Sequence, residues 1–192
     1  VFIYLYRDPR ETVSSILDAW RSRRFVTYPQ LPDWDGPPWS LLLVPGWRDL
    51  ACRSLAEIAA MQWVTTARVL LDDLEALPAE RWCVASYDRL LAEPQAEIER
   101  LCAFTGIVWD RQLTAPLPQA RHTLTSPAPE KWRRNAEELK PVMPLIGEVA
   151  ERAREVFARP PAKKPAPRRS PAEAPLAPAA PAADLHAFHS VY

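Results

Sequence analysis

The most constraining feature of the sequence is a short apolar strand followed at once by a capped helix. Residues 1–6 are almost wholly apolar, which is typical of a strand buried on both faces of a parallel sheet. Asp8 is placed to cap a helix, Pro9 suits its first turn, and Glu11 suits the acidic position of a capping box. We therefore expect a strand, a sharp turn and a helix to about Arg24, as in an α/β protein with a parallel sheet flanked by helices.

The rest of the chain predicts more helices and one more strand. We expect helices over 54–77, 94–105, 130–139 and 145–157, a buried strand over 82–86, a turn or short helix over 87–91, and irregular backbone over 109–129. Residues 25–50 hold five prolines and three tryptophans. This composition predicts a long loop, and loops of that length commonly form a lid or a binding segment.

The prolines also divide the chain into a body and a tail. Eight of the 22 prolines lie within residues 159–183, a segment rich in alanine. This composition predicts an extended, disordered linker. We therefore expect a folded body over 1–158, a linker over 159–183, and a segment over 184–192 that could begin a further domain, because aromatic side chains return there.

Charge and cysteine usage exclude several classes of protein. Residues 1–158 hold 19 Lys/Arg and 22 Asp/Glu, which argues against a general nucleic-acid-binding protein. Cys52, Cys83 and Cys102 form no C-x-x-C pair, so we expect reduced thiols, no disulfide framework and no metal site. No apolar run approaches the ~20 residues of a membrane span, and no signal peptide is visible. We therefore expect a cytoplasmic protein.

Arg7 follows the first predicted strand directly, at the place where ligands bind in open α/β sheets. A helix N-terminus carries unpaired N–H groups and a partial positive charge, and a guanidinium beside it can bind phosphate through two hydrogen bonds. Ser15, about two turns into the helix, and its neighbour Ser14 offer hydroxyls to the same anion. The alternative is that Arg7 pairs with a carboxylate and that both serines are surface hydroxyls, and spacing alone favours neither.

The run from Phe2 to Ser15 resembles the second cofactor-binding motif of sulfotransferases that use 3′-phosphoadenosine 5′-phosphosulfate (PAPS). In that family a strand ends in Arg-(Asp/Asn)-Pro, as in Arg7-Asp8-Pro9 here. A serine eight residues after the arginine completes the contacts to the 3′-phosphate of the donor. The resemblance therefore implies that Arg7 and Ser15 bind this phosphate.

Two later segments extend the resemblance over about residues 1–157. The run from Val84 to Pro94 and the helix after it resemble a family segment whose tyrosine approaches adenine, which implies this role for Tyr87. The alternative for Tyr87 is a tyrosine at the edge of the core. Residues 121–134 resemble the late loop and Lys-Trp segment of bacterial sulfotransferases, although the Arg-Lys-Gly loop of cytosolic animal enzymes is not matched. Three more donor-binding candidates follow from this likeness: Lys131, Trp132 and Arg133. Their alternative is an ordinary basic helix start.

Two parts of the family pattern have no counterpart in the sequence: the Gly-x-Pro-(Arg/Lys)-Ser-Gly-Thr loop that holds the 5′-phosphosulfate, and the catalytic base that precedes the second motif in many members. The four glycines are not clustered. The resemblance therefore implies a P-loop-NTPase-like sheet that is incomplete at its N-terminal side, in the C-terminal portion of a bacterial-type sulfotransferase.

Such a portion would carry the 3′-phosphate-binding half of an enzyme that transfers a sulfuryl group from PAPS to an acceptor hydroxyl or amine. We expect it to be inactive alone, to need no metal, and to work with further domains of the same parent chain. The alternative from a different class is a non-catalytic remnant or interaction module, joined by the linker to another domain.

Overall fold

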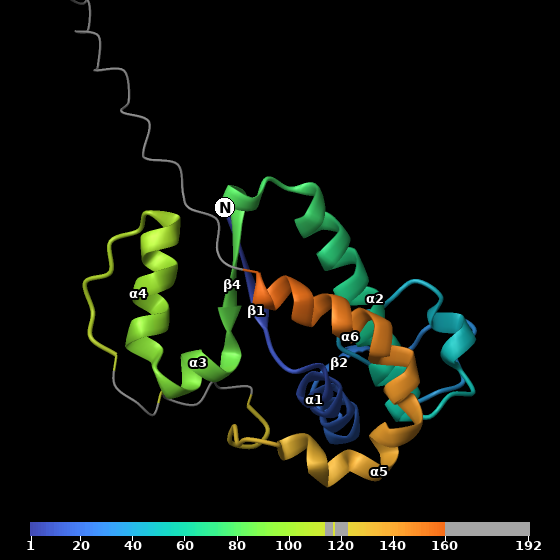
Figure 1. The fold of residues 1–192 in the computed structure, drawn as a ribbon. Coiled ribbons are helices and arrows are strands. Elements are labelled where there is room, and N and C mark those ends of the chain that lie inside the picture. Colours follow the sequence, from blue (N-terminus) through green and yellow to red (C-terminus); the bar gives the residue numbers. More distant parts are fainter. Residues whose placement is uncertain (114–116, 118–122, 160–192) are drawn as a thin grey trace, which may run out of the picture.

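The computed structural model describes residues 1–113, 117 and 123–159. Most of the predicted linker, all of 184–192, and Arg121 and His122 of the late loop lie outside the described residues. The described part is a mixed α/β structure built on two parallel strands (Figure 1). Its elements, in chain order, are β1 (Phe2–Tyr6), α1 (Pro9–Ser22), β2 (Val26–Tyr28), β3 (Trp39–Ser40), η1 (Trp47–Leu50), α2 (Leu55–Ala76), η2 (Ala79–Arg81), β4 (Trp82–Ser86), α3 (Tyr87–Ala92), α4 (Pro94–Thr105), η3 (Lys131–Asn135), α5 (Ala136–Leu139), η4 (Lys140–Val142) and α6 (Met143–Ala158).

The parallel strands β1 and β4 pair in register, from Phe2 opposite Trp82 to Tyr6 opposite Ser86. Helix α4 lies on one side of this pair, and α2 and α6 lie on the other (Figure 1). Cys83 and Ala85 of β4 pack on the α4 side. On the other side, Tyr4 and Tyr6 of β1 and Trp82 and Val84 of β4 contribute to the main core with α1, α2 and α6.

The strand–turn–helix prediction for the first residues is confirmed, although the Glu11 carboxylate contacts the Arg7 guanidinium instead of completing a capping box. The Asp8 carboxylate caps α1 by accepting a hydrogen bond of 2.8 Å from the backbone N–H of Arg10, and Pro9 occupies the first turn. The helix ends at Ser22, two residues before the predicted end, because Arg23 adopts a left-handed backbone conformation. Val13 and Leu17 are completely buried on its inner face.

The expectation that β1 is buried on both faces is wrong. Phe2 is 55% exposed, Ile3 47% and Leu5 50%. Ile3 and Leu5 alternate with the tyrosines that join the core, and the hydrophobic clusters of the described residues include neither of them nor Phe2. The edge of β1 away from β4 is also without a strand in the described part of the chain. Strand β4 does match the prediction, because helices cover both of its faces and four of its five residues are buried.

The outer edge of β4 is closed by side chains of α4 rather than by a third strand. The Glu97 carboxylate accepts a hydrogen bond of 3.0 Å from the backbone N–H of Ser86. Arg100 donates to the carbonyl oxygen of Val84 at 2.6 Å and to Glu97 at 2.7 Å. Two polar groups at this edge therefore have partners without any further strand.

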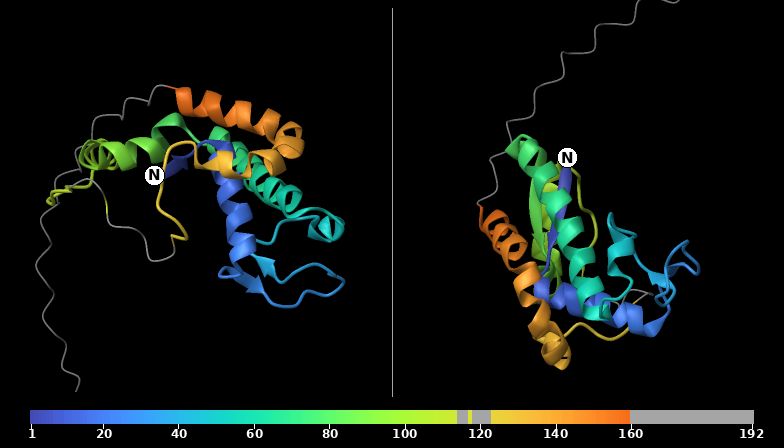
Figure 2. Two further views of the ribbon diagram at one scale, coloured as in Figure 1. Left: turned by 90° about the horizontal axis from the view of Figure 1, so that it is seen from below. Right: turned by 90° about the vertical axis from the view of Figure 1, so that its right-hand side faces the viewer.

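Residues 25–50 form a long loop, as expected, with the short antiparallel pair β2–β3 inside it. This segment lies beyond the end of α1 that is far from β1 and β4 (Figure 2). Trp39 is completely buried there and contacts the rings of Trp20, Trp34 and Trp47. The buried side chain of Gln62 on α2 fixes the loop, because it accepts from the Trp20 indole and donates to the carbonyl oxygens of Ser40 and Leu42.

The C-terminal part of the body differs in detail from the prediction. The expected helix over 130–139 is a 3₁₀ turn (η3) followed by the short helix α5, and α6 begins at Met143, before Pro144, because proline is compatible with a first helical turn. Residues 87–91 are helical, within α3. No helix in the described ranges is long and apolar enough to cross a bilayer.

Candidate anion-binding site

Arg7 and Tyr87 lie side by side at the carboxyl ends of the parallel strands. The register pairs Tyr6 with Ser86, so the next residue of each strand leaves the sheet at the same place. The Cζ atom of Arg7 lies 4.7 Å from the centroid of the Tyr87 ring. This is a cation–π contact, and it lies where α/β folds bind their ligands.

Two hollows open on either side of this pair. The first hollow, of about 420 Å³, runs along α1 between Arg7 and the loop residues Phe25 and Leu41. The second hollow, of about 600 Å³, lies between the start of α1, α3 and residues 127–130. Four residues line both hollows: Arg7, Glu11, Tyr87 and Pro127. The Arg7–Tyr87 pair therefore belongs to both spaces.

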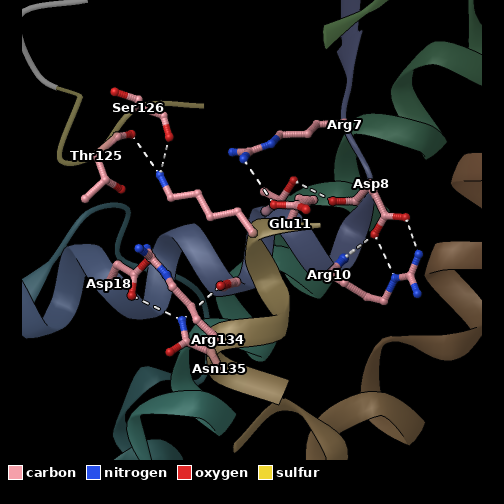
Figure 3. A network of polar contacts seen from close by, with 12 residues as sticks. Arg7, Asp8, Arg10, Glu11, Asp18, Thr125, Ser126, Arg134 and Asn135 are labelled. Atoms are coloured by element: carbon pink, nitrogen blue, oxygen red, sulfur yellow. Dashed lines mark hydrogen bonds and ion pairs between the residues drawn. The ribbon is translucent and has the colours of Figure 1, made fainter. Parts of the chain in front are cut away.

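Lys131 adds a second cation to the first hollow. Its amine donates hydrogen bonds of 2.8 and 2.9 Å to the carbonyl oxygens of Thr125 and Ser126 (Figure 3). These two hydrogen bonds tie the backbone at 125–126 to Lys131. Burial lowers the pKa of Lys131, and the neighbouring Arg7 guanidinium lowers it further. Two like charges in a partly buried space favour the binding of an anion between them.

Glu11 is the acidic neighbour of Arg7, with its carboxylate 3.5 Å from the guanidinium (Figure 3). The carboxylate partner that the alternative interpretation requires is therefore present. The contact is long, and a guanidinium has five N–H donors, so it leaves Arg7 with capacity for a bidentate ligand. The Arg7 side chain remains 23% exposed and lines the hollow.

The two serines of α1 have different environments. Ser14 is buried, and its hydroxyl accepts a hydrogen bond of 2.9 Å from the Asn135 side chain. Ser15 is exposed and lines the first hollow together with Arg7. Both serines line the first hollow, and the Ser14 hydroxyl also anchors η3 through Asn135, so the role of both hydroxyls toward one anion stays a prediction.

The segment 131–133 is divided between the hollows. Lys131 lines the first hollow, whereas Trp132 lines the second and carries the Arg10 guanidinium at 4.6 Å from its ring. Arg133 is exposed, pairs with Glu130 at 2.6 Å and is not among the residues that line either hollow. Of the six candidates, the structure thus brings together Arg7, Ser15, Tyr87 and Lys131, with Trp132 next to them and Arg133 apart.

Several lining residues were not predicted from the sequence. Thr12 and Asp18 belong to the same face of α1 as Ser15, so helical spacing could have identified them. Arg134 lines the first hollow while forming an ion pair with Asp18, and Asn135 donates to Asp18 at 3.1 Å (Figure 3). The basic run from Lys131 to Arg134 suggested Arg134 as a phosphate-binding residue, but not its contact with Asp18, which joins residues 116 positions apart.

Comparison with known proteins assigns the family. A family model described as "Sulfotransferase family" matches residues 1–111, which include β1, α1, β4 and α4. This match covers more than half of the chain, and the chain therefore belongs to the sulfotransferase family. Lys131, Trp132 and Arg133 lie after the matched range.

Among solved structures, the chain is similar to the "Sulfotransferase Domain from the Curacin Biosynthetic Pathway", with a TM-score of 0.41 and 16% sequence identity. The match covers 72% of this chain and 52% of that structure, so this chain spans about half the length of its solved relative. No curated protein matches the sequence. Within the described ranges, no group of three or more His, Cys, Asp or Glu side chains could hold a metal ion.

Proposed function

We propose that the chain binds PAPS in the two hollows and contributes the 3′-phosphate-binding half of an enzyme that transfers a sulfuryl group to an acceptor hydroxyl or amine. The observation that carries this proposal is that Arg7, Ser15, Tyr87 and Lys131 line one hollow, which begins at the carboxyl ends of β1 and β4. These residues come from four separate elements or turns, and a cation pair of this kind suits a dianion.

We place the 3′-phosphate in the part of the first hollow that Arg7 and Lys131 line, with Ser15 in the lining of the same hollow. Arg7 supplies a fork of N–H donors, Lys131 a second positive charge, and Ser15 a hydroxyl. Hydrogen bonds from charged donors to a phosphate are roughly twice as strong as neutral ones. Among the described ion pairs, Arg7 pairs with one acid, Glu11, at 3.5 Å. A bound dianion would compete with the Glu11 carboxylate for the guanidinium.

The adenine fits best in the second hollow. Tyr87 and Trp132 are its two aromatic lining residues, and Pro127 and Pro129 add apolar surface. A flat, weakly polar base gains from stacking against such surfaces. A nucleotide placed in this way crosses the Arg7–Tyr87 pair, with its base on one side of the pair and its 3′-phosphate on the other.

In the proposed reaction the acceptor oxygen or nitrogen attacks the donor sulfur in line. The bond between sulfur and the bridging oxygen breaks, its electron pair leaves with the 5′-phosphate, and the acceptor proton passes to a general base. The residues of this chain hold the donor in position. We propose that the base, and the cation that stabilises the departing phosphate, come from outside these 192 residues.

The proposal is tested by calorimetric titration of 3′-phosphoadenosine 5′-phosphate and adenosine 5′-phosphate into the 192-residue chain. We expect Arg7→Ala to weaken the first nucleotide by about 10- to 100-fold, as for loss of a hydrogen bond from a charged group, and the second by less than about threefold. Arg24→Ala, an exposed arginine beyond the end of α1, is the matched control and should change neither affinity. Equal losses for both nucleotides would reject the role of Arg7 in 3′-phosphate binding.

A further inference from the structure

Glu11 is a carboxylate beside the two cations to which we assign the donor phosphate. It lines both hollows, as Arg7 does, and its side chain is 14% exposed. Lys131 lines the first of these hollows as well. A negative charge in this position repels a phosphate bound at Arg7 and Lys131, and water screens the repulsion only in part because all three side chains are half-buried.

The acids on either side of Glu11 along the chain have close partners. The Asp8 carboxylate accepts hydrogen bonds of 3.1 and 2.9 Å from the guanidinium of Arg10. Asp18, which also lines the first hollow, forms an ion pair with Arg134. Both carboxylates are therefore held by arginines other than Arg7.

The contact of Glu11 is longer than these. Among the described residues its carboxylate accepts one hydrogen bond, from the Arg7 guanidinium at 3.5 Å (Figure 3). Charge-assisted hydrogen bonds between nitrogen and oxygen are ordinarily about 2.7–2.9 Å long. Glu11 also lies in the first turn of α1, where the partial positive charge of the helix end stabilises a carboxylate without Arg7. The Arg7–Glu11 pair can therefore open when another anion competes for the guanidinium.

Glu11 acts on Lys131 as well as on Arg7. Burial and the Arg7 charge lower the pKa of Lys131, and the Glu11 carboxylate opposes both effects. In a site without an anion, Glu11 thus compensates two neighbouring cations at once. A bound phosphate takes over this compensation, and the carboxylate then becomes a source of repulsion.

The proposed reaction leaves the 3′-phosphate untouched. The bond that breaks joins sulfur to the oxygen on the 5′ side, so the spent nucleotide, 3′-phosphoadenosine 5′-phosphate, offers Arg7 and Lys131 the same group as the donor does. Contacts that are equally strong before and after the chemical step do not accelerate that step. Very strong contacts of this kind would instead delay the departure of the spent nucleotide, and product release limits many enzymes.

We infer that Glu11 is a displaceable counterion, which limits the affinity of the site for the 3′-phosphate and thereby sets the rate at which the spent nucleotide leaves. In the empty site its carboxylate neutralises Arg7 and Lys131, and on binding the phosphate takes Arg7 from it. The inference rests on the proposed function, because it requires the 3′-phosphate to lie at Arg7. Glu11 then differs from the other residues of the site in the sign of its effect, since it acts against binding.

The test compares the native chain with Glu11→Gln and Glu11→Asp by calorimetric titration of 3′-phosphoadenosine 5′-phosphate. Glutamine keeps the shape but not the charge, and we expect it to tighten binding by about 3- to 30-fold, as for removal of one partly screened repulsion. Glu11→Asp keeps the charge and should stay within about threefold of the native affinity. The gain in Glu11→Gln should disappear in about 1 M sodium chloride and should be smaller for adenosine 5′-phosphate, which lacks the 3′-phosphate.

Two further measurements separate this role from a structural one. Surface plasmon resonance on the immobilised chain should show that the nucleotide leaves Glu11→Gln about 2- to 20-fold more slowly, because affinity differences of this kind arise mainly in dissociation. The empty Glu11→Gln chain should unfold at a lower temperature than the native chain, because Arg7 and Lys131 lose their counterion. Saturation with the nucleotide should shrink or reverse that difference, since the tighter ligand stabilises the variant more.

Glu137→Gln is the matched control, because it removes an exposed carboxylate of α5 that lines neither hollow, and it should change the affinity by less than about twofold. Binding that weakens or stays the same in Glu11→Gln, or that tightens equally in Glu137→Gln, overturns the inference. The donor site stands in that case if Arg7→Ala still discriminates between the two nucleotides. Loss of this discrimination rejects the proposed function, and the inference about Glu11 with it.

Discussion

The guanidinium of Arg7 lies over the ring of Tyr87, with its Cζ atom 4.7 Å from the ring centroid, although the two residues are 80 positions apart. Parallel pairing of β1 with β4 accounts for this contact, because Tyr6 and Ser86 are register partners. Ser86 is also the N-cap of α3, where its hydroxyl accepts a hydrogen bond from the backbone N–H of Arg89 at 3.2 Å. One strand pair thus positions a cation, an aromatic ring and a helix start.

The Tyr87 ring should contribute to nucleotide affinity through its face rather than its hydroxyl. We expect Tyr87→Leu to weaken 3′-phosphoadenosine 5′-phosphate about 3- to 10-fold, because the ring both orients Arg7 and contacts the base. Tyr87→Phe keeps the ring and should change the affinity by less than about twofold. Calorimetric titration checks both variants, with Tyr28→Leu in the exposed strand β2 as control. Equal losses in the Phe and Leu variants would assign the effect to the hydroxyl instead.

Lys131 should act mainly through its charge. We expect Lys131→Met to weaken the same nucleotide about 10-fold at low ionic strength and to make binding less dependent on salt, because one cation of the site is lost. Titrations at two salt concentrations measure this change. Lys140→Met alters an exposed lysine nearby and should leave both the affinity and its salt dependence unchanged. A Lys131→Met variant with an unaltered salt dependence would exclude a direct contact of this amine with the anion.

Glu97 should stabilise the fold through the outer edge of β4. Its side chain is 1% exposed, accepts from the Ser86 backbone and is bonded to Arg100. We expect Glu97→Gln to lower the free energy of unfolding by about 1–3 kcal/mol, because the charge-assisted hydrogen bonds are weakened and Arg100 loses its anionic partner. Urea denaturation followed by circular dichroism gives this value. Glu93→Gln alters an exposed carboxylate on the same side of the sheet and should change stability by less than about 0.5 kcal/mol.

The stabilisation by Glu97 should depend on pH in a defined direction. Hydrogen bonds from Arg100 hold the pKa of Glu97 below its ordinary value of 4.5, although burial opposes this effect. A carboxyl group whose pKa is lowered by folding stabilises the native state above its unfolded pKa, and this stabilisation is lost as the pH falls through the folded pKa. The difference in unfolding free energy between the native chain and Glu97→Gln should therefore be constant above about pH 5 and shrink below pH 4.5. A difference that grows on acidification would contradict the assignment.

Gln62 should hold the loop that presents Leu41. Replacement by leucine leaves the indole N–H of Trp20 and the carbonyl oxygens of Ser40 and Leu42 without their partner. We expect Gln62→Leu to lower the free energy of unfolding by about 2–3 kcal/mol, as for buried polar groups left unpaired, and to speed amide hydrogen exchange in the loop. Gln30→Leu, in the same loop but exposed, is the control. Unchanged exchange in the loop would show that Gln62 does not hold it.

The parts of the fold that local signals encode were predicted well from the sequence. The Asp8 cap with Pro9 placed the start of α1, and the capping box of Ser54 and Glu57, in which each side chain binds the other residue's backbone, placed the start of α2. These features depend on residues within a few positions of one another, so spacing suffices to find them.

Features that depend on distant contacts were not predictable in the same way. An apolar run identifies β1 as a strand, but it carries no information on how many strands and helices cover it, and the burial of β1 was therefore overestimated. Glu97 reads as a surface position of an amphipathic helix until its two partners at the edge of β4 are known. Ser14 and Ser15 are equivalent in sequence, and only the distant Asn135 shows that the buried Ser14 hydroxyl has a structural partner whereas Ser15 is exposed.

Glu97 and Arg100 occupy backbone groups at the outer edge of β4, so a further strand would pair more readily with β1 than with β4. A strand that paired with β4 would have to displace the Glu97–Arg100 ion pair, whose carboxylate is buried. A strand that paired with β1 would meet an edge without a strand in the described ranges and would cover part of Phe2, Ile3 and Leu5. Any additional strand, whether from the same polypeptide or from another molecule, is thus directed to one flank. Kept without such a neighbour, these 192 residues should be prone to self-association through that flank at high concentration.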